Sequence, residues 1–286
     1  MRASGVAHFV GHLIRSFLWG AVLLSAVVWA GPRFADGVAA VMTTGGGAWD
    51  AWWSLALSGA VVAIPAALVF FSAFALFHDA AHGALALPQR INDAVLLMTS
   101  LPLLMSAHGQ RQHHLHHHAH PLEPTDLEGQ GALTSLWWAA LVAPWASVKM
   151  RVAGFNVVPA KVRPWVVAEN LLNVASIVVV ALLDHPGVWV SFFVQLTLQH
   201  TMNAWASHVP HRAPRWLMQL ASRGAWTGSP VILSLVYHLE HHATPRVPCA
   251  LLRPASDVES PLLARAIAEP LPWPPLQLDD RPRPRR

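Results

Sequence analysis

The sequence has few charged residues and almost no cysteine. Only 12% of its 286 residues are Asp, Glu, Lys or Arg, whereas 54% are hydrophobic, and Cys249 is the single cysteine. One cysteine excludes an intrachain disulfide and fits a site that faces a reducing cytosol. So little charge beside so much apolar surface is unusual for a soluble domain and is typical of a membrane protein.

The sequence also lacks a concentrated basic patch. Its pI is near 10.2, yet Lys and Arg are dispersed until the closing RPRPRR. This dispersal argues against a nucleic-acid partner and favours membrane lipids as the anionic partners. The Pro- and Arg-rich segment 270–286 is predicted to be a disordered tail, which leaves residues 1–269 as one membrane domain.

Long apolar runs predict an all-α integral membrane protein. A membrane-spanning helix needs about 20 mainly apolar residues. Four stretches qualify as spans: 16–30 with some preceding residues, 52–77, 165–183, and 188 to about 204. They form two hairpins, the first joined by GPRFADG and TTGGG and the second by residues 184–187. Two shorter apolar stretches, 94–107 and 132–148, are predicted to be interfacial helices.

The placement of Lys and Arg orients these spans, because cytoplasmic loops carry an excess of both. With four crossings, every one of the 19 basic residues except Arg33 falls on the side of the two termini. We therefore expect both termini and the histidine-rich segments to be cytoplasmic. The histidine-rich segments would cap the four transmembrane helices there, at the inner membrane if the chain is bacterial.

Histidine, by contrast, is abundant, and most of the 18 histidines lie in three clusters. These are HDAAH at 78–82, HHLHHHAH at 113–120 and HLEHH at 238–242. Residues at i, i+3 and i+4 share one face of a helix, so each cluster projects several imidazoles in one direction. All three clusters follow predicted spans on the same side. Their number exceeds the needs of one metal and predicts two, although imidazole suits several metals alike.

HDAAHG, HxxHH and YHLEHH, in this order, resemble the three histidine boxes of the membrane fatty acid desaturase superfamily. That superfamily includes acyl desaturases, lipid hydroxylases and carotenoid ketolases. The resemblance covers roughly residues 50 to 252, and it is specific for the superfamily but not for the substrate. The central run allows two registers, His113 with His116 and His117, or His114 with His117 and His118. The acidic residue that ends HHAHPLEPTD selects the second register by resemblance.

The resemblance implies a set of nine metal ligands. They are His78, His82, His114, His117, His118, His200, His238, His241 and His242. His200 is included because LQHT at 198–201 is similar to a segment of acyl-lipid desaturases. The turn ASHVPHR resembles one shared by some desaturases and carotenoid ketolases, which makes its histidines, His208 and His211, second candidates. Asn203 could replace His200, and His113 and His116 are neighbours of the ligands.

A ligating imidazole needs an acceptor for its other N–H group. Asp79, Glu240 and Asp126 lie within or beside the boxes and are expected to fill this role. Glu169 lies in the third span, where polar groups are usually paired or functional. It is also close enough to Trp165 to be simply interfacial.

The resemblance further implies two iron ions, dioxygen and an unactivated C–H bond of a lipid. The first hypothesis is a desaturase that acts on a fatty acyl lipid or an acyl-carrier thioester. Its electrons would come from an external ferredoxin or cytochrome. The alternative within the same class is a lipid hydroxylase or a carotenoid ring hydroxylase or ketolase. The alternative of another class is a histidine-rich metal transporter, which is disfavoured because transporters place their ligands near the middle of the membrane.

Overall fold

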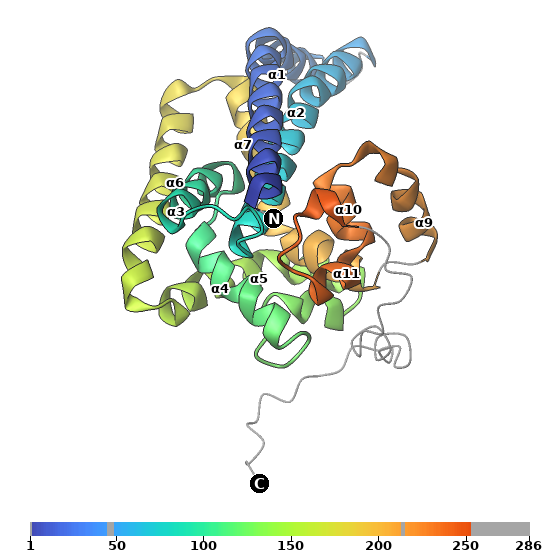
Figure 1. Cartoon of the computed structure of the whole chain (residues 1–286). Coiled ribbons are helices and arrows are strands. Elements are labelled where there is room, and N and C mark those ends of the chain that lie inside the picture. The colour runs from blue at the N-terminus through green and yellow to red at the C-terminus, as the bar shows by residue number, and fades with distance from the viewer. Residues whose placement is uncertain (1, 45–48, 213–214, 253–286) are drawn as a thin grey trace.

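The computed structural model describes residues 2–44, 49–212 and 215–252 (Figure 1). Most of these residues are helical, and none of them forms a strand. The predicted all-α class is therefore confirmed. The predicted tail, 270–286, lies outside the described residues, and the domain boundary at 269 stays a prediction.

By length and composition, three described helices are able to cross a membrane. They are α1 (Arg2–Thr43), α2 (Trp49–Ala81) and α6 (Arg163–Leu183) with the short turn η2 (Ala160–Val162) before it. The fourth predicted span begins as α7 (Pro186–His200), which has 15 residues. It continues beyond Thr201 as the π-helical turn η3 (Asn203–His208) and as α8 (Val209–Arg212). A fourth crossing and its sidedness remain predictions.

The segment GPRFADG lies inside α1, so the prediction of a loop there was wrong. Pro32 occupies the interior of the helix, although it removes one backbone donor. The glycines of this segment serve close packing instead of a turn. A Cβ atom on Gly31 would lie 2.4 Å from a carbon of the His185 ring, and one on Gly37 would lie 3.0 Å from the Cα of Leu55. The sequence pattern does not distinguish these two uses of glycine.

Helices α1, α2 and α7 pack side by side (Figure 1). The tight connection predicted between the third and fourth spans is present between α6 and α7. Asp184 ends α6 in the left-handed region with a φ of 43°. His185 then caps α7, because its Nδ1 accepts a hydrogen bond from the Gly187 amide at 3.2 Å. The three packed helices form the frame on which the shorter helices rest.

Shorter helices gather around the C-terminal end of α2 (Figure 1). The two stretches predicted to be interfacial form α3 (Gln89–Leu103) and α5 (Leu136–Val157). The remaining elements are α4 (Ala107–Ala119), η1 (Gly129–Leu133), α9 (Arg215–Arg223), η4 (Ala225–Thr227), α10 (Pro230–Val236), α11 (His238–Ala243) and η5 (Cys249–Leu251). A buried cluster that includes Phe70, Phe77, Leu103 and Met202 joins α2 to α3 and to the turn after α7.

A buried carboxylate anchors the start of α4 to α6. Glu169 is fully buried and accepts hydrogen bonds from the Ser106 hydroxyl at 2.6 Å and from Nδ1 of His108 at 2.6 Å. The backbone N–H of His108 also donates to it, at 3.2 Å. The His108 ring stacks on Trp165, and its Nε2 lies 3.4 Å from Asp93. Glu169 is therefore paired, and it fixes the beginning of the helix that carries the histidine run.

Candidate metal centre

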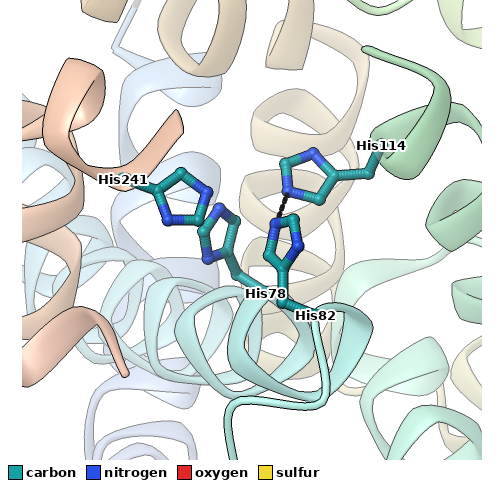
Figure 2. A group of neighbouring side chains, drawn as sticks. All are labelled: His78, His82, His114 and His241. Atoms are coloured by element: carbon teal, nitrogen blue, oxygen red, sulfur yellow. Dashed lines mark hydrogen bonds between the residues drawn. The ribbon is translucent and has the colours of Figure 1, made fainter. Parts of the chain in front are cut away.

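One group of four histidines converges at the end of α2 (Figure 2). His78 and His82 come from the last turn of α2 and the residue after it, His114 from α4, and His241 from α11. One ring nitrogen of each lies within 4.8 Å of the others. The dashed line in Figure 2 joins Nε2 of His82 to Nε2 of His114, which are 2.8 Å apart.

A second group contains His117, His211, His238 and His242. They come from α4, α8 and α11. Nε2 of His238 lies 3.2 Å from Nε2 of His211 and 3.1 Å from Nε2 of His242. The i, i+3 and i+4 spacing of the sequence thus brings the rings of α4 and α11 to two neighbouring centres.

His118 lies between the two groups. Its Nε2 is 3.1 Å from Nε2 of His241 in the first group. Its ring stacks on His242 of the second group, with 4.1 Å between the ring centroids. The two groups and His118 therefore form one continuous cluster of nine imidazoles.

The tautomers of several rings fit metal binding. In three of them Nδ1 lies 2.7 Å from an oxygen: Oε1 of Glu128 for His114, Oδ2 of Asp126 for His117 and the carbonyl oxygen of Ser207 for His211. Nδ1–H is the donor to a carbonyl or an ionised carboxylate. In a neutral ring, Nε2 then carries a lone pair. These lone pairs face one another within the groups, where a metal ion would accept them. The residues present therefore fit two metal ions.

The protonation of most rings in the cluster supports the same conclusion. His117 differs: burial acts to lower its pKa, but the hydrogen bond to Asp126 and nearby carboxylate charges together raise it. Burial and then the charges of neighbouring imidazoles lower the pKa of both His82 and His118 to about 2. Burial and the charge of His117 lower the pKa of His211 to about 4. Among the described residues, Nδ1 of His118 and Nδ1 of His241 are buried without a hydrogen-bond partner. Neutral imidazoles are the form that binds metal.

Two carboxylates orient ligand rings, and one of them was missed by sequence reasoning. Asp126 was expected in this role. Burial acts to raise its pKa, but the hydrogen bond and charge of His117 hold that pKa below its ordinary value. Glu128 was not expected, and burial raises its pKa to about 7. Its position two residues after Asp126 was the available signal, since it lies in the same acidic segment.

Asp79 was expected to accept a hydrogen bond from a ligand ring, but its two oxygens contact His12 and the backbone of Cys249. Its Oδ2 lies 3.0 Å from Nε2 of His12, and its Oδ1 accepts the backbone N–H of Cys249 at 2.9 Å. The ring of His78 is contacted by Cys249 and not by Asp79: the Sγ of Cys249 lies 3.1 Å from Nδ1 of His78. Burial raises the pKa of this thiol well above its ordinary value. Glu240 is half-buried in α11 beside the ligand histidines.

Among the described residues, the second group contains His211, a second candidate of the sequence, and does not contain His200. Nδ1 of His200 donates to the carbonyl of Leu196 in its own helix at 2.9 Å, and His200 belongs to neither group in the described chain. The π-helical turn η3 separates these two histidines. One extra residue in a turn rotates the following side chains by about 100° relative to an α-helix. A helical register taken from the sequence does not anticipate this rotation.

The other secondary candidates lie beside the two groups and not in them. His113 donates Nε2–H to the carbonyl of Met150 at 2.8 Å, which holds α4 against α5. His208 contacts the carbonyl of Gly131 at 3.1 Å. The remaining two are His116, which pairs with a threonine hydroxyl, and Asn203, which lines a small pocket that reaches His114.

A family model described as fatty acid desaturase matches residues 50–269, which is well over half of the chain. The matched region contains every histidine of the two groups and His118. No curated protein and no solved structure gives a significant match.

Proposed function

Because the chain belongs to the fatty acid desaturase family, we propose that it is a membrane oxidoreductase that introduces a double bond into an unactivated alkyl chain. The observation that carries this proposal is the pair of four-histidine groups linked by His118. One iron ion would be held by the group of His78 and the other by the group of His211. Iron held in such a pair would supply the activation of dioxygen that breaking an unactivated C–H bond requires.

Apolar side chains beside the first group suit a lipid substrate. Phe74, Phe77, Met202 and Ala206 form the apolar side of the small pocket that reaches His114, and polar side chains such as Glu128 complete its lining. Trp205 packs edge-on against Phe74, with 4.9 Å between the ring centroids. Such a wall favours an alkyl chain over water near the reacting carbon. We infer that the substrate is a fatty acyl lipid or an acyl-carrier thioester.

The electron balance requires an external donor. Reduction of dioxygen to two molecules of water takes four electrons and four protons, and formation of one double bond supplies two electrons and two protons. The other two electrons must reach the centre from outside. We propose a ferredoxin or a cytochrome as the donor, docking on the cytoplasmic side where the histidine segments are expected.

Oxygen insertion is the second candidate function, and His211 favours it. This ligand belongs to the VPHR turn, which resembles carotenoid ketolases as well as some desaturases. LQHT, the segment more similar to acyl-lipid desaturases, contributes no member to either group among the described residues. A lipid hydroxylase or a carotenoid ring hydroxylase or ketolase would use the same two groups.

The test combines metal content with product mass. We expect about two iron ions per chain in detergent-purified protein loaded with ferrous iron, and fewer in His117→Ala. His120→Ala is the matched control, because this histidine belongs to the same run but its side chain is 49% exposed. Incubation with acyl lipids, dioxygen and a reducing system should give a product lighter by two hydrogens.

A product heavier by one oxygen would replace desaturation with hydroxylation, and a product that gains one oxygen and loses two hydrogens would replace it with ketone formation. Variable metal content that is equal in wild type and His117→Ala would contradict the enzyme. Metal uptake into vesicles by such a protein would support the transporter instead.

A further inference from the structure

His78 differs from the other oriented rings of the centre in its hydrogen-bond partner. The rings of His114, His117 and His211 donate Nδ1–H to a carboxylate or a backbone carbonyl. Nδ1 of His78 faces the sulfur of Cys249 at 3.1 Å. Both residues are buried, with exposed fractions of 5% for His78 and 1% for Cys249.

The sulfur is held in place by a second buried contact. The backbone N–H of Cys249 donates to Oδ1 of Asp79 at 2.9 Å. The other oxygen of Asp79 lies 3.0 Å from Nε2 of His12, a residue of α1 that is also buried. Asp79 thus joins α1, the end of α2 and the segment after α11, and it fixes the sulfur beside the His78 ring.

We propose that Cys249 is a positioning residue of the metal centre, whose sulfur accepts Nδ1–H of His78 and leaves Nε2 of that ring to the metal. The inference rests on the proposed function, because it assigns His78 a metal ligand's role. Sulfur is a weak acceptor, so it orients the ring while raising its basicity less than a carboxylate would. The first group would then combine a carboxylate-supported ring, His114, with a thiol-supported ring, His78.

Cys249 also packs in an apolar cluster with Leu233 and Leu252, and this gives the competing explanation of its presence. A residue that only fills space is best replaced by Val, which keeps the apolar contacts and removes the acceptor. A residue that orients His78 is best replaced by Ser, which keeps an acceptor and sacrifices apolar packing. The two explanations therefore predict opposite orders for Cys249→Ser and Cys249→Val.

The experiment measures the rate at which iron-loaded full-length protein in detergent releases iron to a ferrous chelator. Loss of an orienting partner typically weakens metal binding by about 10- to 100-fold. We expect Cys249→Val to release iron about 10-fold or more faster than wild type, and Cys249→Ser to fall between them. Leu233→Val is the control, because it alters the same apolar cluster and removes no hydrogen-bond acceptor from His78, and its release rate should match wild type.

Thermal unfolding of the metal-free variants separates packing from positioning. We expect Cys249→Val to unfold at a temperature no lower than Cys249→Ser although it holds iron less tightly. Iron release from Cys249→Val as slow as from wild type, or slower than from Cys249→Ser, would overturn the positioning role. A wild type that binds iron in pairs but forms no lipid product would contradict the proposed function and leave the order of the variants to decide the inference. A wild type that binds no iron would overturn both.

Discussion

Nδ1 of His114 lies 2.7 Å from Oε1 of Glu128, which is 14 residues further along the chain. The other oxygen of Glu128 accepts a hydrogen bond from Nε2 of Gln110 at 3.0 Å. Gln110 and His114 are neighbours on one face of α4, so a single carboxylate holds both the helix and the ligand ring. The carboxylate therefore sets the direction in which Nε2 of His114 points.

Glu128→Gln tests this role. The amide keeps the shape of the side chain but loses the charge that favours Nδ1–H of His114. We expect metal affinity to fall by about 10- to 100-fold, measured by competition with a ferrous chelator. Glu123→Gln is the matched control. Among the ion pairs of the described residues, Glu123 pairs only with His120, and its own side chain is 57% exposed. Equal affinities for the two variants would remove Glu128 from the centre.

His211→Ala and His200→Ala test which of these two histidines binds metal, since the structure favours His211 and the sequence predicted His200. His211 belongs to the second group, whereas His200 bonds to its own helix. We expect His211→Ala to lower the iron content from about two to about one per chain. His200→Ala should retain both ions, as elemental analysis would show. The reverse result would restore His200 as the ligand and mean that η3 is wound differently when metal is bound.

Local sequence periodicity and the family resemblance together predicted much of the centre. Spacings of three and four residues allowed two registers in α4, and the resemblance selected His114 with His117 and His118. The structure turns these three rings toward the groups. His113 faces away, toward α5. The same spacing accounts for α11, where His238 and His242 face the second group and His241 faces the first. Apolar runs were likewise sufficient for the helices able to cross a membrane.

Other features depend on contacts between distant segments. The bond of Cys249 to His78 joins residues 171 positions apart, and no local pattern carries that information. The π-helical turn η3 packs closely against η1, because Gly131 leaves no room for a Cβ atom beside the carbonyl oxygen of Asn203. This contact is tertiary. The histidine clusters and the role of Asp126 could therefore be predicted from the sequence, whereas Glu128 and Cys249 as partners of ligand rings and the place of His211 in the second group could not.

Gly129→Ala is predicted to disrupt the second group through Asp126. A Cβ on Gly129 would lie 2.0 Å from Oδ2 of Asp126. That carboxylate accepts hydrogen bonds from Nδ1 of His117 and from the amides of Leu122 and Gly129 itself. It is therefore unable to move without losing bonds to buried donors, at a cost of about 1–3 kcal/mol each.

We expect Gly129→Ala to bind about one iron ion per chain and to unfold at a lower temperature than wild type. The control is Gly20→Ala in α1, where nothing lies within 4 Å of the added Cβ. Alanine is the better helix former there, by up to about 1 kcal/mol. Full iron binding by Gly129→Ala would mean that η1 relaxes without disturbing His117.

The stability of the metal-free protein should fall as the pH falls below about 6.5, the ordinary pKa of histidine. Burial, followed by the charges of neighbouring imidazoles, lowers the pKa of folded His82 and His118 to about 2, and burial with the charge of His117 lowers that of His211 to about 4. In this window the unfolded chain binds protons that the folded chain does not, so the free energy of unfolding decreases with decreasing pH. Two groups act in the opposite direction because the folded chain holds their protons more tightly. Burial raises the pKa of Glu128 to about 7. For His117, burial acts to lower the pKa, but the hydrogen bond to Asp126 and nearby carboxylate charges together raise it.

Histidines with a lowered pKa outnumber the groups with a raised pKa. Burial also lowers the pKa of four further histidines of the cluster: His114, His238, His241 and His242. We therefore expect the unfolding temperature of chelator-treated protein to drop steadily from about pH 7 to about pH 5.5. Iron-loaded protein should show a smaller drop until the ions are released, because bound metal excludes protons from the same nitrogens. An unfolding temperature of the metal-free protein that stays constant or rises over this interval would show that the imidazoles do not converge as neutral rings.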